Sequence, residues 1–207
     1  MIALIDYGAG NLTSVRKALN HLGATFYTPL TPSALAHANA VIVPGVGNFE
    51  ATSALDDKWR RSISAALGRK KPFLGICLGL QWLFLGSDEA PQVAGFGAMT
   101  GTCRLIRQRT SEVSTTNLFK VPHVGWNSLH RTRDSWLLNG VGNGDQVYFT
   151  HSYAAPITDD CVGSTYYGID FASVVERGHL AGVQFHPEKS GAVGLQILKN
   201  FLDRIQY

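Results

Sequence analysis

The sequence predicts an α/β fold with a mostly parallel central sheet flanked by helices, and three observations carry this prediction. Short apolar runs alternate with amphipathic runs up to about residue 85, which is the strand–helix order of parallel sheets with right-handed crossovers. The apolar runs are continuous, as expected for strands buried on both faces. No linker-like stretch and no fixed repeat interrupts the 207 residues, so we expect residues 1–207 to form a single domain.

The elements of the first half follow in order. A strand over residues 2–5 leads into a helix that Asn11 or Thr13 caps and Gly23 ends, with an apolar stripe at helical spacing. Proline begins the next, short helix, and a longer helix follows the third apolar run. The remaining predictions are strands at 24–28, 40–43 and 73–76, and helices at 32–38, 50–67 and 78–85.

Beyond about residue 88 the pattern changes to short β-type runs separated by Gly, Asn and Ser, which predicts extra antiparallel strands. We expect these strands at 146–150, 164–167, 171–176 and 180–185. An exposed loop is predicted at 110–116, a helix with a glycine-rich exit at 131–143, and a final amphipathic helix at 192–205.

Composition excludes several classes of protein. No apolar run reaches the roughly 20 residues of a membrane span, and the amino terminus meets Asp6 after four apolar residues without a basic lead, unlike a signal peptide. A net charge of +3 is too mild for a nucleic-acid footprint. We therefore expect a cytoplasmic protein with neither nucleic acid nor membrane as a partner. An excess of basic residues is interpreted as a solvated face, and it comprises Arg104, Arg107, Arg109, Lys120, Arg131 and Arg133.

Cys77 has the sequence context of a catalytic nucleophile. Gly75 and Gly79 flank it in a glycine-x-nucleophile-x-glycine pattern between a predicted buried strand and a helix. The turn of such an elbow is so sharp that larger flanking side chains would collide, and the helix amino terminus favours a thiolate. The alternative is a buried structural cysteine beside packing glycines. Cys103 and Cys161 lack such flanks and are expected to be inert free thiols.

The segment His186-Pro187-Glu188 offers a base for that nucleophile. It follows an apolar predicted strand, in which side chains two apart face the same way, so Glu188 is expected beside His186. One ring nitrogen then binds the carboxylate and the other takes the proton of Cys77. A zinc-deaminase interpretation of H-x-E requires a P-C-x-x-C motif, which is missing. His186 as an ordinary hydrogen-bonded polar residue is the remaining alternative.

Two glycine loops are less specific. Residues 6–11 begin like a dinucleotide-binding motif, but Thr13 stands where the third glycine belongs, so a tight turn is expected. Residues 44–47 follow a predicted strand at the carboxyl edge of the sheet, where active sites of α/β proteins gather and backbone amides form oxyanion holes.

Residues 75–81 and 184–188 together resemble the triad-type class I glutamine amidotransferases, which share a flavodoxin-like α/β domain. Four further segments narrow the resemblance to the family of glutaminase subunits of imidazole glycerol phosphate synthases. These segments are residues 6–12, 44–47, 122–127 and 148–153, and the likeness runs from the first strand to the last helix. Leu80 stands where the family often has methionine and Val124 where it often has methionine or isoleucine, and neither position carries proton chemistry.

The resemblance implies that Cys77 attacks the amide of glutamine, His186 moves the proton and Glu188 orients the imidazole. No cofactor and no metal is expected. The resemblance places Gly47, Gln81, Ser152 and Tyr153 around glutamine, Gly45, Val46 and Leu78 in the oxyanion hole, and Asn11, Trp126, Tyr148 and Lys189 at a partner interface.

The implied partner is a (β/α)₈-barrel cyclase in a heterodimer, which receives ammonia and makes imidazole glycerol phosphate and an aminoimidazole carboxamide ribotide from a ribonucleotide. Trp126 as a core aromatic remains an alternative. A glutaminase serving another acceptor, such as pyridoxal phosphate synthase, shares the triad but is not expected to carry residues 122–127 in this form. A regulatory subunit would need a broken triad, and a general cysteine hydrolase does not explain Gln81.

Overall fold

The computed structural model describes residues 1–10, 12–107 and 120–205, and its centre is a sheet of eight strands within these residues. Five neighbouring strands run parallel, in the spatial order β2 (Phe26–Tyr27), β1 (Ile2–Leu4), β3 (Ala40–Gly45), β4 (Phe73–Cys77) and β13 (Leu180–Val183). Numbered along the chain, this is the 2-1-3-4-5 order of flavodoxin-like folds. The predicted fold class is confirmed.

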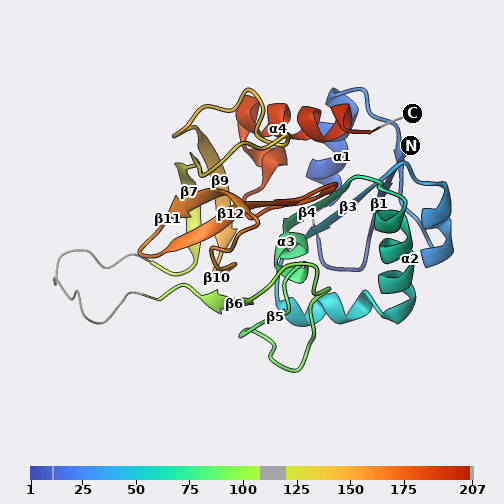
Figure 1. Ribbon diagram of the computed structural model, residues 1–207, viewed down its shortest axis with the longest axis horizontal. Coiled ribbons are helices and arrows are strands. Elements are labelled where there is room, and N and C mark those ends of the chain that lie inside the picture. Colours follow the sequence, from blue (N-terminus) through green and yellow to red (C-terminus); the bar gives the residue numbers. More distant parts are fainter. Residues whose placement is uncertain (11, 108–119, 206–207) are drawn as a thin grey trace.

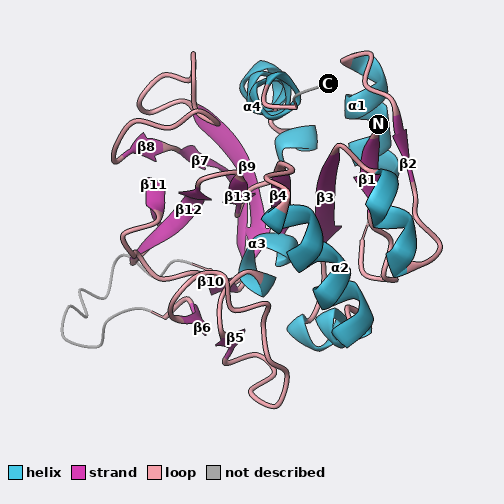
Figure 2. Ribbon diagram, turned by 45° about the vertical axis from the view of Figure 1, so that its right-hand side comes forward, coloured by secondary structure: helices cyan, strands magenta, loops and turns pink. Residues whose placement is uncertain are grey.

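The sheet continues with antiparallel strands, as the second half of the sequence predicts. β12 (Asp170–Arg177), β11 (Cys161–Tyr166) and β8 (His130–Arg131) extend it beyond β13. Two small sheets lie beside it (Figure 2). One pairs β7 (His123–Ser128) with β9 (Gln146–His151), and the other joins β10 (Tyr153–Ala154), β6 (Thr102–Leu105) and β5 (Gly86–Ser87).

Helices cover both faces of the parallel strands (Figure 1). α1 (Leu12–His21) and α4 (Gly191–Asp203) pack on one face, and α2 (Asp57–Gly68) and α3 (Leu78–Trp82) on the other. Successive residues of β1 show why: Ile2 and Leu4 belong to the first core, Ala3 to the second, because side chains alternate along a strand. Short 3₁₀ helices span Pro32–His37, Phe49–Ala54 and Pro187–Lys189. Within the described ranges no helix is long and apolar enough to cross a membrane.

The helix predicted at 131–143 is wrong. Arg131 ends β8, paired with Gly163 of β11, and turns follow it. The amides that a helix would use are bound otherwise: Leu137 N–H donates to the Glu176 carboxylate at 3.3 Å, and Leu138 N–H donates to the Ser135 hydroxyl at 3.1 Å. Leu137 and Leu138 are both buried, so these apolar residues fill the core from a turn.

The helix predicted at 50–67 is divided. Asp56 accepts hydrogen bonds from Lys58 N–H and Trp59 N–H at 2.9 and 3.1 Å, and this side-chain cap begins α2 at Asp57, after the 3₁₀ helix.

The helix predicted at 78–85 ends at Trp82 instead, because the loop that follows occupies its last carbonyls. Phe96 N–H binds Trp82 O, Met99 N–H binds Leu83 O and Gly97 N–H binds Phe84 O.

Other differences concern element ends. The strands predicted at 24–28 and 180–185 shorten to β2 and β13, and Thr13 lies inside α1 and is not its cap. Asn11, Arg109 and the loop predicted at 110–116 lie outside the described residues. The described members of the predicted basic face, Arg104, Arg107, Lys120, Arg131 and Arg133, are all exposed.

Candidate active site

Cys77 is the last residue of β4 and has a backbone conformation that side chains rarely adopt, with φ 53°. The two flanking positions have room only for glycine. A Cβ on Gly75 would lie 2.5 Å from the carbonyl oxygen of Gly79, and a Cβ on Gly79 would collide with the carbonyl oxygen of Val43 on the neighbouring strand. The sequence therefore forms a nucleophile elbow here because both flanks lack side chains.

Neighbouring parallel strands bring the other site segments to Cys77. Gly45, at the end of β3, pairs with Cys77 across the sheet, and Val183, at the end of β13, pairs with Ile76. The residues that follow β3 and β13 thus emerge beside the elbow, at the carboxyl edge of the sheet.

His186 and Glu188 form a buried pair. Their Nδ1 and Oε1 atoms are 2.8 Å apart, and their side chains are 3% and 4% exposed. Glu188 lies in the 3₁₀ helix Pro187–Lys189, so the alternation of a strand, from which we expected the pairing, is not what brings the two side chains together. The Ser190 hydroxyl donates to the His186 carbonyl at 2.6 Å and holds this turn in place.

The second nitrogen of His186, Nε2, is buried without a hydrogen-bond partner among the described residues. Burial alone would lower the pKa of His186, but interactions with the Cys77 sulfur and the Glu188 carboxylate outweigh it and raise the pKa to about 10. The imidazole is therefore protonated at neutral pH and stands close to a thiol that is 4% exposed. An imidazolium in that place favours a thiolate.

A cavity of about 270 Å³ opens at the elbow. All four residues expected around glutamine line it, together with two members of the elbow; they are Gly47, Gln81, Ser152, Tyr153, Cys77 and Leu78. A larger hollow of about 590 Å³, lined by Trp136 and Arg204 among others, lies away from the elbow and is lined by no cysteine or histidine. No cluster of three His, Cys, Asp or Glu side chains suited to a metal occurs within the described part of the chain.

The cavity also contains residues that the sequence analysis missed. Glu89 presents a carboxylate, of which Oε2 accepts a hydrogen bond from Phe49 N–H at 2.8 Å. Burial raises the pKa of Glu89, and the hydrogen bond from Phe49 opposes that rise. His151 and Thr150 line the wall beside Ser152. No motif marks Glu89 in the sequence, because an acid in a polar loop resembles any solvated acid.

Of the residues expected in the oxyanion hole, one lines the cavity and another has its N–H bound elsewhere. Leu78 lines the cavity, whereas the N–H of Val46 donates to the carbonyl of Ala9 at 3.2 Å and so is already bound. Gly45 is closely packed, because a Cβ there would collide with the Tyr7 hydroxyl and lie 2.9 Å from the Leu78 Cβ. Gly47 follows with φ +100°, a conformation that favours glycine.

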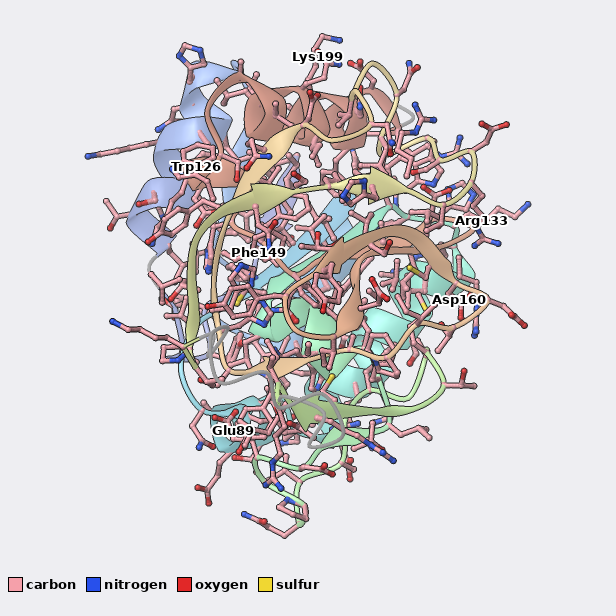
Figure 3. All side chains as sticks on the ribbon, turned by 90° about the vertical axis from the view of Figure 1, so that its left-hand side faces the viewer. Glu89, Trp126, Arg133, Phe149, Asp160 and Lys199 are labelled. Carbon is pink, nitrogen blue, oxygen red and sulfur yellow. The ribbon has the colours of Figure 1, made fainter. Side chains whose placement is uncertain are left out.

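Three of the four residues expected at a partner interface gather on the surface. Trp126 of β7 pairs with Tyr148 of β9, with ring centroids 6.1 Å apart, and Lys189 Nζ lies 5.8 Å from the Tyr148 ring centre. Trp126 is 56% exposed, so it is not a core aromatic. In Figure 3, Trp126 lies at the upper left of the view and the cavity residue Glu89 at the lower left. The fourth residue, Asn11, lies outside the described residues.

The other two cysteines are packed into the protein. Cys103 is fully buried and Cys161 is 5% exposed, and neither lines the cavity at the elbow. Burial raises the pKa of both thiols, which disfavours their thiolates.

Comparisons with known proteins show the family of this chain. The family model of glutamine amidotransferase class-I matches residues 3–205. A protein of Salinibacter ruber (strain DSM 13855 / M31) named imidazole glycerol phosphate synthase subunit HisH is 42% identical over 207 residues, covering 97% of this chain and 93% of its own. A protein of the same name from Bacillus cereus (strain AH187) is 41% identical over 204 residues with the same coverage.

Solved structures share the fold. The crystal structure of a glutamine amidotransferase aligns with a TM-score of 0.73 and 15% identity, covering 99% of this chain and 98% of that one. The structure of PurLQS from Thermotoga maritima aligns with a TM-score of 0.72 and 17% identity at the same coverage. At such identities these likenesses show the fold alone.

Proposed function

Because the chain belongs to the class-I glutamine amidotransferase family, we propose that it is the glutaminase subunit of an imidazole glycerol phosphate synthase. The observation that carries the chemistry is the His186–Glu188 pair, 2.8 Å apart, beside a cysteine elbow that opens into a cavity. The relatives of that name and their near-complete coverage support the choice of acceptor pathway. In this proposal residues 1–207 form one amidotransferase domain.

The proposed reaction proceeds through a thioester. The Cys77 thiolate attacks the side-chain carbonyl carbon of glutamine, and the tetrahedral intermediate collapses as the His186 imidazolium gives its proton to the leaving amine, which departs as ammonia. Water then attacks the thioester while His186 takes its proton, and glutamate leaves with the thiolate restored. Glu188 holds one ring nitrogen throughout and stabilises the imidazolium.

The cavity walls supply complementary groups for glutamine. Glu89 offers a carboxylate to the α-ammonium group, a contact that the chemistry of the cavity favours. Gln81, Ser152 and Tyr153 border the same space, as the family resemblance implies, with Gly47 at its edge. Leu78 and Val46 are the proposed oxyanion donors, and Val46 requires a rotated peptide to act, because its N–H now binds Ala9.

Ammonia explains the need for a partner. In neutral water it is protonated and loses its nucleophilicity, so direct transfer to an acceptor enzyme preserves it. We propose a heterodimer with a (β/α)₈-barrel cyclase, in contact with the surface formed by Trp126, Tyr148 and Lys189. Tryptophan and tyrosine side chains at the surface are typical of the residues that contribute most to protein interfaces.

Reconstitution tests the proposal. The purified chain is mixed with a cyclase subunit, glutamine and the formimino-aminoimidazole ribonucleotide, and imidazole glycerol phosphate is measured; we expect product in proportion to glutamate. A parallel mixture with the synthase subunit of pyridoxal phosphate formation is expected to give no glutamine-dependent product. The reverse pattern, product only in the second mixture, contradicts the assignment and favours the other acceptor.

A further inference from the structure

Gln184 is a fully buried amide that touches the nucleophile. It follows β13, two residues before His186, and its Nε2 lies 3.6 Å from the Cys77 sulfur, within hydrogen-bond distance for sulfur. Its Oε1 accepts a hydrogen bond from Gln81 Nε2 at 3.1 Å. Since an amide has a donor end and an acceptor end, the effect of Gln184 on the sulfur depends on which end faces it.

The neighbours of Gln81 determine that orientation. Gln81 Nε2 also lies 2.8 Å from the carbonyl oxygen of Tyr153, which accepts hydrogen bonds and cannot donate one. The Gln81 nitrogen therefore donates twice, once to Tyr153 and once to Gln184. Gln184 must meet it with oxygen, which leaves its N–H₂ group facing Cys77.

The Tyr153 carbonyl also accepts a hydrogen bond from His151, which is itself bound to His123. His151 Nδ1 donates to the carbonyl at 2.9 Å, so His151 Nε2 is left to accept a hydrogen bond from His123 Nδ1 at 3.0 Å. His123 Nε2 accepts in turn from Asn127 Nδ2 at 3.3 Å. Burial lowers the pKa of His151 to about 3 and that of His123 to about 4, so both rings are neutral and the tautomers agree at every step.

Asn127 begins this series of hydrogen bonds, and its other contacts fix the orientation of its side-chain amide. Its Oδ1 accepts a hydrogen bond from Ser128 N–H at 2.8 Å, while its Nδ2 donates to the Tyr166 carbonyl at 3.0 Å as well as to His123. Every hydrogen bond from Asn127 to Cys77 thus has one possible direction. The hydrogen bonds converge on the Tyr153 carbonyl, which accepts from both His151 and Gln81, and such a network is more rigid than its separate contacts.

We propose that Gln184 is a further catalytic residue of the glutaminase reaction, whose side-chain N–H stabilises the Cys77 thiolate, and that His123 and His151 are positioning residues that hold the Tyr153 carbonyl to which Gln81 donates. The proposal rests on the proposed function. The ionisable groups facing Cys77 are His186, with Glu188 behind it, and Tyr7 from the loop after β1. Gln184 differs from these groups because it is neutral at every pH and donates to the sulfur throughout the working range.

Alkylation of Cys77 by iodoacetamide, without glutamine, tests this directly. The thiolate displaces iodide, so the rate reports the thiolate, and peptide mass spectrometry assigns it to Cys77. Gln184→Glu keeps the oxygen that Gln81 requires and replaces the donor by a second oxygen. We expect its rate at neutral pH to fall about tenfold or more, and the rise of the rate with pH to move to higher pH.

Three further variants distinguish the loss of the donor from the effect of an added charge, from the loss of the Tyr153 support and from general damage to the fold. Gln184→Met removes the donor without adding charge, and we expect the same direction of change, smaller in size. His151→Phe removes the donor to Tyr153 and is expected to lower the rate less than Gln184→Met. Asn200→Asp is the matched control, because Asn200 is a buried amide on α4 that donates to Leu137 and Asn139 carbonyls; its alkylation profile should equal that of the wild type.

Thermal unfolding shows that each variant is folded. If either folded Gln184 variant keeps a profile within about twofold of the wild type, or if Asn200→Asp shows the same loss, the proposal is overturned. If the wild-type chain releases no glutamate with its partner, the proposed function is contradicted instead. The alkylation assay uses neither glutamine nor partner, so its result is independent of that outcome.

Discussion

At the scale of single residues, Cys77 can adopt its strained backbone conformation because the flanking Gly75 and Gly79 have no side chains. Both glycines of the elbow lie against carbonyl groups that belong to the sheet or to the turn itself. The sequence predicts this feature well, because a strained turn restricts its flanking residues to glycine and so leaves a readable pattern.

Gly79→Ala tests the packing of the elbow. The new methyl group would collide with the Val43 carbonyl in the middle of the parallel sheet, so we expect a loss of about 2 kcal/mol or more of unfolding free energy. Gly68→Ala at the end of α2 is the control, since no atom lies within 4 Å of its Cβ position. It is expected to be neutral or to stabilise by about 0.5 kcal/mol. Urea unfolding measures both, and equal effects would show that the close contact at Gly79 is relieved at low cost.

Other site residues could not be predicted one by one. The pairing of His186 with Glu188 is local and was expected, although from the wrong backbone conformation. Gln184 contacts Cys77 across 107 positions of the chain and Gln81 across 103, and no local pattern reports such contacts. Glu89 becomes distinct only when the fold turns its carboxylate into the cavity.

Glu188→Gln should move the alkaline limit of glutamine hydrolysis to lower pH. In the wild type the pKa of His186 is raised to about 10, so the imidazolium that protonates the leaving amine persists until pH approaches that value. A neutral amide stabilises the imidazolium less than a carboxylate does, so the ring loses its proton earlier as pH rises. Glutamate release by the assembled pair, measured from pH 7 to 11, should fall at lower pH in the variant. Coincident alkaline limbs would show that His186 does not govern this limit.

At the scale of elements, hydrophobic patterning predicted the long strands and helices. It failed where side chains, and not backbone carbonyls, accept the hydrogen bonds of backbone N–H groups. Leu137 and Leu138 lie in the segment predicted as a helix, yet Glu176 and Ser135 bind their amides from outside a helix. β5 and β10 have two residues each, too few for any periodicity to be read. The strand β7 has six residues but escaped prediction because Gly125 and polar residues break its apolar pattern.

The loop after β3 should restrain the enzyme until a partner binds. Val46 N–H binds Ala9 O at 3.2 Å, so one oxyanion donor is directed away from the reaction, and the neighbouring glycines let the peptide rotate at low steric cost. Since one missing oxyanion donor costs on the order of a hundredfold in rate, we expect partner with ribonucleotide to raise glutamate release by about that factor.

The measurement compares glutamate release by the chain alone, with partner, and with partner and ribonucleotide. Iodoacetamide alkylation of Cys77 under the same three conditions is the control, because the thiolate forms independently of the oxyanion hole. If the three rates of glutamate release agree within about twofold, the Val46 peptide does not limit the reaction.

At the scale of the whole molecule, three neighbouring parallel strands bring distant segments to one edge. The proposed oxyanion loop follows β3, the proposed nucleophile ends β4 and the proposed base follows β13, so the candidate site is assembled from segments about 30 and 110 residues apart along the chain. The strand–helix alternation of the first half was sufficient to predict this edge. The strand of β9 was predicted, but the pairing of the two small sheets was not, and β10 with the residue before it completes the cavity wall through Tyr153 and Ser152.

The central claim is that this chain makes ammonia and that another chain uses it. Synthesis of imidazole glycerol phosphate by the reconstituted pair, with Cys77→Ala in place of the wild type, tests it most directly. We expect glutamine-dependent synthesis to fall below detection while synthesis from added ammonium salt continues at the wild-type rate, because the acceptor chemistry lies on the partner. Equal loss of both activities in a pair that still assembles would contradict this division of labour.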